Sequence, residues 1–324
     1  MLQFAEGFFA GEERDGFYVD GTMKTVWAAE LEVLAEIGRI CEKYQLQWFA
    51  DGGTLLGAVR HQGFIPWDDD IDICLKRPDY EKLMRILPEE LPAGWQLKHA
   101  YRGNVPHSQF WACVQNSDEI SIEASRLSRF HGCPFIVGVD IFPLDYLPED
   151  PQEAELEENL IHLIWGTVQL VHMEDRTRED EETLDGRLRS IEEFSGVGIE
   201  RAGTDEQLIG SLWTLANQIA MSYTEQDGSQ LTSMIYHLEE GRYVFEAAWY
   251  EDVIYLPFET FELPVPIGYD GVLRSWYGDY MVKIRNTSAH EYPCYAKQIR
   301  ILRDMVKQME EHAEREGSDA VQME

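Results

Sequence analysis

Four aspartates fall within five consecutive positions, and their spacing suits metal-dependent chemistry. They are Asp68, Asp69, Asp70 and Asp72. Such a group of like charges repels itself and is stable only where a cation neutralises it. Mg²⁺ is a natural partner, because it binds carboxylate oxygens together with the phosphate oxygens of a substrate. The cluster therefore predicts a Mg²⁺ or Mn²⁺ site that acts on a nucleotide or phosphoester.

Alternating apolar and acidic residues place part of this cluster on a strand. Ile71–Leu75 has the pattern of a strand, on which successive side chains point to opposite faces. We expect Asp70 and Asp72 to share one face and to hold the metal. Asp68 continues that face and assists if the strand begins early, whereas Asp69 should point away from it.

A fifth aspartate, Asp140, lies inside the apolar run Ile136–Phe142. An acid without a partner is costly in such a place. We expect the run to form a strand that Pro143 ends. If this strand neighbours the first acidic strand, Asp140 can complete the metal site or accept a proton from an attacking hydroxyl. The alternative for Asp140 is a structural role, as a cap or an arginine partner.

A glycine pair precedes the acids. Gly52 and Gly53 let backbone N–H groups approach an anion closely. We expect Thr54–Val59 to form a short helix with Thr54 as its N-cap, and a helix N-terminus favours phosphate. Arg60 can clamp a phosphate oxygen or form a salt bridge to the acidic cluster. The predicted phosphate-binding residues are thus Gly52, Gly53, Thr54 and Arg60.

A calcium-binding EF-hand loop is the obvious competitor, because Asp68, Asp70 and Asp72 match its first three acidic positions. The sixth position of that loop requires glycine, and here it is Ile73. The twelfth requires a bidentate glutamate, and here it is Asp79. The sequence therefore excludes an EF-hand.

Hydrophobic periodicity predicts the elements that must position these residues. Helices are expected at Thr22–Tyr44, Thr54–Val59, Pro78–Leu87, Glu153–Met173, Glu206–Tyr223, Tyr269–Trp276 and Tyr295–Arg315, and strands at Gln47–Ala50, Ile71–Leu75, Trp95–Ala100, Gln109–Gln115 and Ile136–Phe142, with a hairpin within Tyr250–Val265. The charge-dense stretch Glu174–Arg189 is expected to be a helix end and a mobile loop. Glu316–Glu324 should fray.

The order of these elements is α/β first and largely helical later. We expect a catalytic core at residues 1–150 and a helical insertion of unknown role at residues 151–242. Residues 243–324 should form a hairpin and helices that pack back on the core, so that the whole chain is one integrated domain.

The charge of the chain excludes one class of partner. The 324 residues include 27 Lys and Arg against 60 Asp and Glu, a formal net charge of −33. Binding to DNA or RNA needs phosphate neutralisation by basic side chains, so the sequence predicts no nucleic-acid partner. The same charge disfavours direct docking on anionic lipid.

Cysteine usage and hydropathy indicate a cytoplasmic protein. The five cysteines are scattered and odd in number, as expected of reduced thiols. The N-terminus lacks the basic and apolar regions of a signal peptide. The best membrane candidate, Leu160–Met173, is too short to span a bilayer and contains histidines. We therefore expect no transmembrane segment.

The motifs around the acids resemble those of the LicD family, which is related to fukutin and fukutin-related protein. The resemblance rests on three blocks of this sequence: Gly52–Asp72, Val139–Asp145 and Tyr277–Met281. It implies an α+β fold with a nucleotidyltransferase-like mixed β-sheet core flanked by helices. It also implies that Asp70 and Asp72 form the metal-binding pair, that Asp68 extends it and that Asp140 is the third acid.

The resemblance further implies transfer of a phospho-alcohol from a CDP-activated donor to a sugar hydroxyl. The donor would be CDP-choline or a CDP-ribitol-like molecule. The acceptor would be a sugar or lipid-linked glycan, such as a precursor of lipopolysaccharide or teichoic acid. A lipid-linked acceptor implies that the protein acts at the cytosolic face of the membrane. A choline group needs aromatic or acidic surroundings. The aromatic candidates are Trp67, Trp111, Trp276, Tyr277 and Tyr280, with core packing as their alternative role.

Two other functions remain open from the sequence. The same fold and acids would serve nucleotidyl transfer to a small molecule, in which pyrophosphate leaves. A catalytically inactive relative that only binds is the second alternative.

Overall fold

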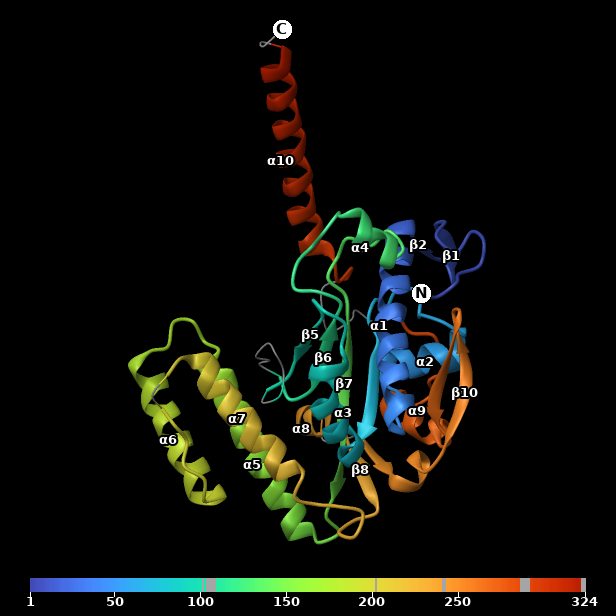
Figure 1. Cartoon of the computed structure of the whole chain (residues 1–324). Coiled ribbons are helices and arrows are strands. Elements are labelled where there is room, and N and C mark those ends of the chain that lie inside the picture. The colour runs from blue at the N-terminus through green and yellow to red at the C-terminus, as the bar shows by residue number, and fades with distance from the viewer. Residues whose placement is uncertain (101, 103–108, 202, 241–242, 286–291, 322–324) are drawn as a thin grey trace.

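A mixed β-sheet flanked by helices forms the core, as predicted (Figure 1). The computed structural model describes residues 1–100, 102, 109–201, 203–240, 243–285 and 292–321. In these residues the central sheet has the order β3 (Phe49–Ala50), β4 (Asp72–Lys76), β7 (Gly138–Leu147), β6 (Ala112–Gln115) and β5 (Gln96–Lys98). β8 (Gln230–Thr232) pairs with the end of β7, and β9 (Val244–Glu246) pairs with β8.

Helices surround this sheet. They are α1 (Gly21–Tyr44), α2 (Gly52–His61), α3 (Arg77–Glu90), α4 (Ala124–Arg129), α5 (Pro151–Val171), α6 (Arg178–Ser195), α7 (Asp205–Ala220), α8 (Met234–Glu240), α9 (Tyr269–Tyr277) and α10 (Ala296–Val321). In Figure 1, α5, α6 and α7 form a group beside the sheet, and α10 extends away from the body. No helix in the described part of the chain is long and apolar enough to cross a membrane.

Smaller elements complete the fold. Two antiparallel hairpins pair β1 (Glu12–Arg14) with β2 (Phe17–Val19) and β10 (Val253–Phe258) with β11 (Phe261–Pro266). A 3₁₀ turn, η1 (Ala247–Tyr250), precedes β10. The predicted hairpin within residues 250–265 is therefore confirmed. The extension of the sheet by β8 and β9 comes from residues 230–246, within and just after the segment expected to be a helical insertion.

The expectation that Pro143 ends its strand was wrong. β7 continues through Pro143 to Leu147. On one side of β7, pairing with β6 stops at Ile141 and pairing with β8 begins at Asp145. Pro143 falls in this gap, where the N–H group that proline lacks has no partner strand to meet. A single strand can therefore serve two neighbours in succession.

The expectation of a mobile loop in Glu174–Arg189 was also wrong. α6 begins in that stretch with a capping box between Thr177 and Asp180, and Gly196 in the left-handed region ends it. Leu184 and Leu188 are buried among the charges and supply the packing that orders the helix. At the other end of the chain, residues 316–321 continue α10 where fraying was expected.

A buried ion pair joins the group of helices to the sheet. Arg77, at the start of α3, donates to both carboxylate oxygens of Asp145 on β7, at 2.6 and 2.8 Å. A third guanidinium N–H is 2.8 Å from Oδ1 of Asn217 on α7. All three side chains are buried. Breaking such a pair strands the remaining charge away from water.

Replacing Arg77 with methionine should lower the free energy of unfolding by about 3–5 kcal/mol, because Asp145 would lose its counter-charge. Chemical denaturation measures the loss. The matched control is Arg178→Met on α6, whose pair with Glu182 is exposed and is expected to contribute under about 1 kcal/mol. Equal losses in the two variants would contradict this assignment.

Glu157 on α5 lies near this pair without a cation of its own. Its side chain is buried, and neither carboxylate oxygen has a hydrogen-bond partner in the described structure. Burial, followed by the charges of Asp145 and Glu158, raises the pKa of Glu157 to about 9. Folding therefore favours the protonated form of this carboxyl.

The Glu157→Gln variant should be less sensitive to alkaline pH than the wild type. The folded pKa of Glu157 lies above its ordinary value of 4.5, so its contribution is fully present at pH 4 and is lost as pH rises toward 9. We expect the variant to gain on the order of 4 kcal/mol relative to wild type between pH 5 and pH 8.5, because most of the difference between the ordinary and the folded pKa falls in this range. Parallel stability curves for the two proteins over this range would rule out the shift.

Candidate active site

Two aspartates from distant parts of the chain face one another on neighbouring strands. β4 and β7 run parallel, and Asp72 is the register partner of Asp140. Paired residues on adjacent strands project to the same side of a sheet, so both carboxylates lie on one face. Ile73 and Ile141, the next pair, turn to the other face and are buried. The predicted neighbourhood of the two acidic strands is confirmed.

Asp68 and Asp70 lie near Asp72 and Asp140, but they are not on the strand as predicted. β4 begins at Asp72, so both residues belong to the irregular segment before the strand and strand periodicity does not place them. Burial, then Asp70 and Asp140, raise the pKa of Asp72 well above its ordinary value, and Asp68 contributes in the same direction. The four carboxylates therefore share one electrostatic field.

Asp69 turns to a different partner. Its side chain is fully buried, and Oδ2 accepts a hydrogen bond from the backbone N–H of Cys294 at 2.5 Å. Asp69 thereby fastens the acidic segment to the chain just before α10.

The glycine pair begins α2 directly beside the acids. Gly52 has a φ of +47°, in the left-handed region that favours glycine. A Cβ atom on Gly52 would lie 3.3 Å from Oδ2 of Asp72, and one on Gly53 would lie 2.5 Å from Oδ2 of Asp68. The absence of side chains thus lets the N-terminus of α2 approach the carboxylates. Phosphate binding by this turn stays a prediction.

Thr54 is not the N-cap that was expected. The N-cap of α2 is Asp51, whose side chain makes no capping hydrogen bond. Thr54 instead accepts a hydrogen bond at Oγ1 from the backbone N–H of Asp72, at 2.9 Å. The backbone N–H of Asp51 donates to the carbonyl of Asp72 at 3.0 Å. These bonds fix the start of α2 against the start of β4.

Asp51 is a site residue that the sequence reasoning missed. It is 2% exposed, and its Oδ1 has no hydrogen-bond partner in the described structure. Burial raises the pKa of Asp51 to about 6. Its position directly before the glycine pair, at the end of an apolar strand, is a signal that could have identified it.

Asp140 has its own surroundings. Cys113, its register partner on β6, and Trp111, two residues earlier, both hydrogen-bond to its side chain. Burial outweighs these bonds and raises the pKa of Asp140 to about 6. At neutral pH the carboxyl is therefore mostly ionised and can accept a proton.

Arg60 is distant from the glycine turn. It lies in the last turn of α2, so eight residues of helix separate it from Gly52, roughly 12 Å along the axis. One guanidinium N–H donates to the carbonyl of Tyr280 at 2.9 Å. The structure therefore shows Arg60 tying α2 to the chain after α9, and its predicted phosphate contact stays a prediction.

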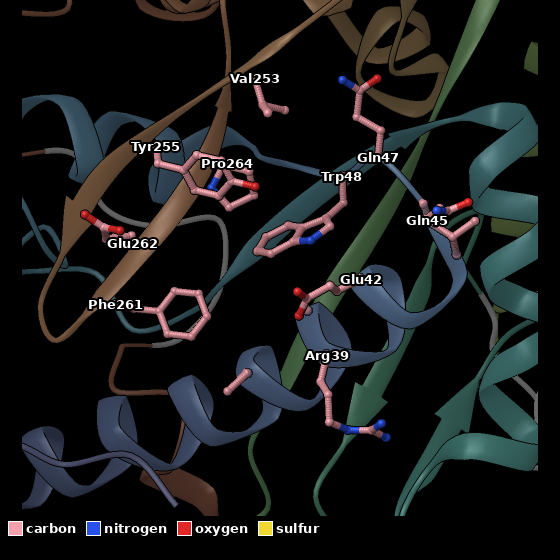
Figure 2. Close-up of a pocket in the computed structure, with 13 residues that line it drawn as sticks. Arg39, Glu42, Gln45, Gln47, Trp48, Val253, Tyr255, Phe261, Glu262 and Pro264 are labelled. Atoms are coloured by element: carbon pink, nitrogen blue, oxygen red, sulfur yellow. The ribbon is translucent and has the colours of Figure 1, made fainter.

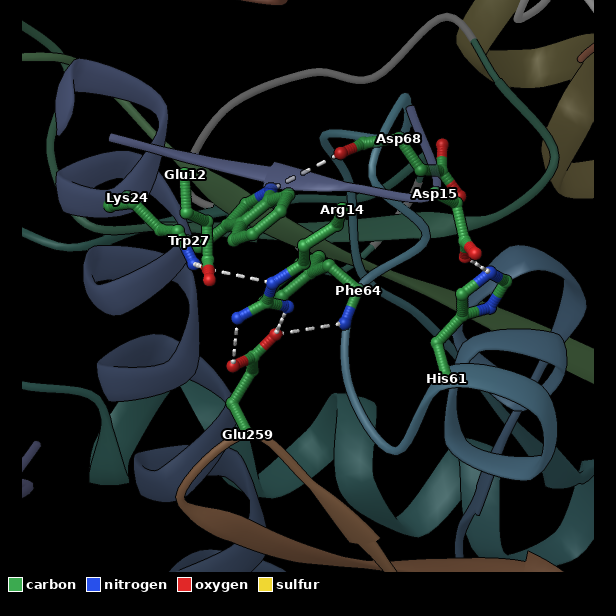
Figure 3. A network of polar contacts seen from close by, with 9 residues as sticks. All are labelled: Glu12, Arg14, Asp15, Lys24, Trp27, His61, Phe64, Asp68 and Glu259. Carbon is green, nitrogen blue, oxygen red and sulfur yellow. Dashed lines mark hydrogen bonds and ion pairs between the residues drawn. The ribbon is translucent and has the colours of Figure 1, made fainter. Parts of the chain in front are cut away.

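An ionic network holds the loop that leads to the acids (Figure 3). Arg14 forms a two-pronged pair with Glu259 at the tip of the β10–β11 hairpin, at 2.5 and 3.1 Å. Glu259 also accepts a hydrogen bond from the backbone N–H of Phe64, at 3.3 Å. On α1, the indole N–H of Trp27 donates to the carbonyl of Asp68 at 3.1 Å. Contacts from the β1–β2 hairpin, from α1 and from the β10–β11 hairpin thus restrain the acidic segment and the loop before it.

The donor set fits a hard divalent cation. Within the described residues, no three His, Cys, Asp or Glu side chains converge on one ion position. Mg²⁺ does not need three, because it keeps several waters and uses one or two carboxylates with substrate phosphates. The partnerless oxygen of Asp51 and the raised pKa of Asp72 mark uncompensated negative charge. Asp70 and Asp72 therefore suit Mg²⁺ or Mn²⁺.

A separate groove lies away from these acids (Figure 2). It has a volume of about 620 Å³ between the end of α1 and the β10–β11 hairpin. Trp48, Tyr255 and Phe261 line it, with Arg39 and Glu262 at its edges. None of its lining residues belongs to the acidic cluster, so this groove is not part of the candidate active site.

Known proteins are similar to this chain over the segment that carries the acids. A family model described as LicD/FKTN/FKRP, nucleotidyltransferase domain, matches residues 45–148. The chain is 23% identical over 260 residues to the lipopolysaccharide cholinephosphotransferase LicD of Haemophilus influenzae, across 78% of this chain and 88% of that protein.

Two uncharacterized Rickettsia proteins match shorter stretches. RT0683 of Rickettsia typhi is 38% identical over 68 residues, which is 21% of this chain and 22% of that protein. RP689 of Rickettsia prowazekii is 35% identical over 74 residues, which is 23% of this chain and 28% of that protein. Residues 45–148, which carry the paired acids of β4 and β7, thus match the LicD/FKTN/FKRP nucleotidyltransferase domain, and the similarity to the Haemophilus protein extends over most of the chain.

Proposed function

We propose that this protein is a metal-dependent phosphotransferase that moves phosphocholine from CDP-choline to a sugar hydroxyl of a cell-surface glycan precursor. The observation that carries the proposal is the pairing of Asp72 with Asp140, beside a glycine turn, in a LicD-family domain. The cholinephosphotransferase name of the Haemophilus relative supports phosphocholine as the transferred group.

The carboxylates at the start of β4 bind the donor pyrophosphate indirectly. Asp70 and Asp72, with Asp68 beside them, would hold a divalent metal, which neutralises charge as the pyrophosphate bond breaks. The N–H groups of Gly52 and Gly53, at the N-terminus of α2, would bind phosphate oxygens. These groups orient the donor so that its choline-bearing phosphorus faces the acceptor.

Asp140 is the proposed general base. It accepts the proton of the sugar hydroxyl, and the sugar oxygen forms a bond to the choline-bearing phosphorus. The bond from that phosphorus to the bridging oxygen breaks, and CMP leaves with the oxygen. A pKa of about 6 suits this role, because the carboxylate is ionised at neutral pH and still basic enough to take a proton.

A location in the cytoplasm, with peripheral association at the cytosolic membrane face, is part of the proposal. A lipid-linked acceptor would lie at that surface. The net charge of −33 disfavours anionic lipid, but the first turns of α10 expose a locally basic group, Lys297, Arg300, Arg303 and Lys307, interrupted by the exposed Asp304. Basic residues near an anionic surface contribute about 1 kcal/mol each.

Incubation with a panel of activated donors tests the reaction class. We expect CMP release from CDP-choline that requires Mg²⁺ or Mn²⁺ and rises with a sugar acceptor, because attack at the choline-bearing phosphorus expels CMP. Nucleotide chromatography measures it. Pyrophosphate release from a nucleoside triphosphate would instead establish the nucleotidyltransferase alternative, and a protein that turns over neither class would overturn the enzymatic proposal.

Asp70→Asn should lower turnover by roughly a hundredfold or more, because the amide lacks the charge that holds the metal at the breaking bond. In a thermal-shift assay the wild type should gain stability with Mn²⁺, and the variant should lose most of that gain. Asp118→Asn, at an exposed loop position, is the matched control and should behave as wild type. Near wild-type turnover in Asp70→Asn would remove this residue from the metal site.

A further inference from the structure

Six aromatic rings form a continuous contact chain next to the acids. This aromatic cluster consists of Trp111, Phe142, Tyr236, Tyr243, Trp276 and Tyr277. Neighbouring ring centroids lie between 4.4 Å, for Tyr243 and Trp276, and 5.8 Å, for Trp276 and Tyr277. Phe142 lies on β7, Trp111 and Tyr243 directly precede β6 and β9, and the other rings lie on α8 and α9, so no sequence window contains them together.

The aromatic cluster touches the acidic site at both ends. Trp111 hydrogen-bonds to the side chain of Asp140, and Phe142, two residues after Asp140 on β7, points to the same face of the sheet. At the other end, the hydroxyl oxygen of Tyr277 lies 4.0 Å from the position that a Cβ of Gly52 would take. The rings and the carboxylates therefore border one region.

The aromatic cluster differs from a core packing cluster. Trp27 and Phe64 stack at 4.6 Å and are fully buried, as core rings are. In contrast, Tyr236 and Trp276 are only partly buried, and Tyr277 is 39% exposed. The indole N–H of Trp276 is itself buried and has no hydrogen-bond partner among the described residues. These rings retain surface that folding does not cover.

Charge distinguishes Tyr236 and Trp276 from two other aromatic candidates. The sequence also suggested Trp67 and Tyr280, but Arg285 lies over Trp67 at 5.3 Å and Arg274 over Tyr280 at 5.8 Å. Within the described residues no such cation stacks on Tyr236 or Trp276.

Tyr236 lies in the field of the carboxylates. Burial and then the charges of Asp72, Asp51 and Asp140 raise the pKa of its hydroxyl. The rings therefore combine aromatic surface with negative potential, a combination that attracts a cation and repels an anion.

We infer that the aromatic cluster, with Tyr236 and Trp276 at its centre, binds the quaternary ammonium group of the donor. This inference rests on the proposed function, because the phosphate bound at the acids places the choline group beside them. A quaternary ammonium has no N–H to donate, so ring faces and nearby carboxylates are what can recognise it. A neutral polyol such as ribitol carries no charge for these ring faces and carboxylates to attract.

Isothermal titration of the whole protein with CDP-choline and CDP-ribitol, in the presence of Mg²⁺, tests the site. We expect Trp276→Leu to weaken CDP-choline binding by roughly tenfold, the equivalent of about 1.4 kcal/mol, while CDP-ribitol binding changes by less than about twofold. Trp276→Phe keeps an aromatic face and loses no hydrogen bond, so it should retain most of the preference. Trp165→Leu on α5 is the matched control at a partly buried tryptophan outside the cluster.

The outcomes separate this inference from the proposed function. The choline site would be overturned if Trp276→Leu weakened the binding of both donors equally, or left the preference for CDP-choline unaltered. It would also be overturned if the wild type bound neither donor or bound both with equal affinity. CMP release from both donors at the same efficiency would keep the transferase and reject the site. A choline preference that Trp276→Leu removes, in a protein that releases no CMP, would keep the site and reject the transferase.

Discussion

The register between β4 and β7 is the constraint on which the rest of the site depends. These strands run parallel, and a parallel pair needs a long crossover, supplied here by α3, β5, β6 and α4. The crossover returns the chain so that Asp140 pairs with Asp72. A slip of one residue would turn Asp140 to the buried face that now holds Ile141. One backbone alignment therefore decides whether the two carboxylates can act together.

The surrounding contacts hold these carboxylates close together although their charges repel one another. The glycine pair lets the N-terminus of α2 approach Asp68 and Asp72. The bonds among Asp51, Thr54 and Asp72 lock α2 to β4. The network of Arg14, Trp27 and Glu259 restrains the loop from the outside. Within the described residues, Oδ1 of Asp51 has no hydrogen-bond partner and the pKa of Asp72 is raised, as expected of a site that can bind a cation together with a phosphate substrate.

The site draws on more of the chain than the matched domain. Residues 45–148 supply the acids, the glycine turn and Trp111, whereas Tyr236 and Trp276 come from α8 and α9. The later chain is joined to the core by β8 alongside β7, and by Arg77 between Asp145 and Asn217. Under the proposed function, the phosphate chemistry would belong to the matched domain at residues 45–148, and selection of the transferred group would depend also on α8 and α9.

Local sequence was sufficient for the acidic strand, the glycine turn, most helices and the β10–β11 hairpin, because periodicity and turn residues act within a few positions. It also identified Asp70, Asp72 and Asp140 as acids whose crowding or apolar surroundings cost free energy. Tertiary structure alone decided that Asp72 faces Asp140, that Asp51 is buried, that Pro143 lies within β7 and that α6 is ordered by packing. It also decided which aromatic rings meet beside the acids. Register, burial and ring contacts depend on residues far apart in the chain, and no local pattern contains their energies.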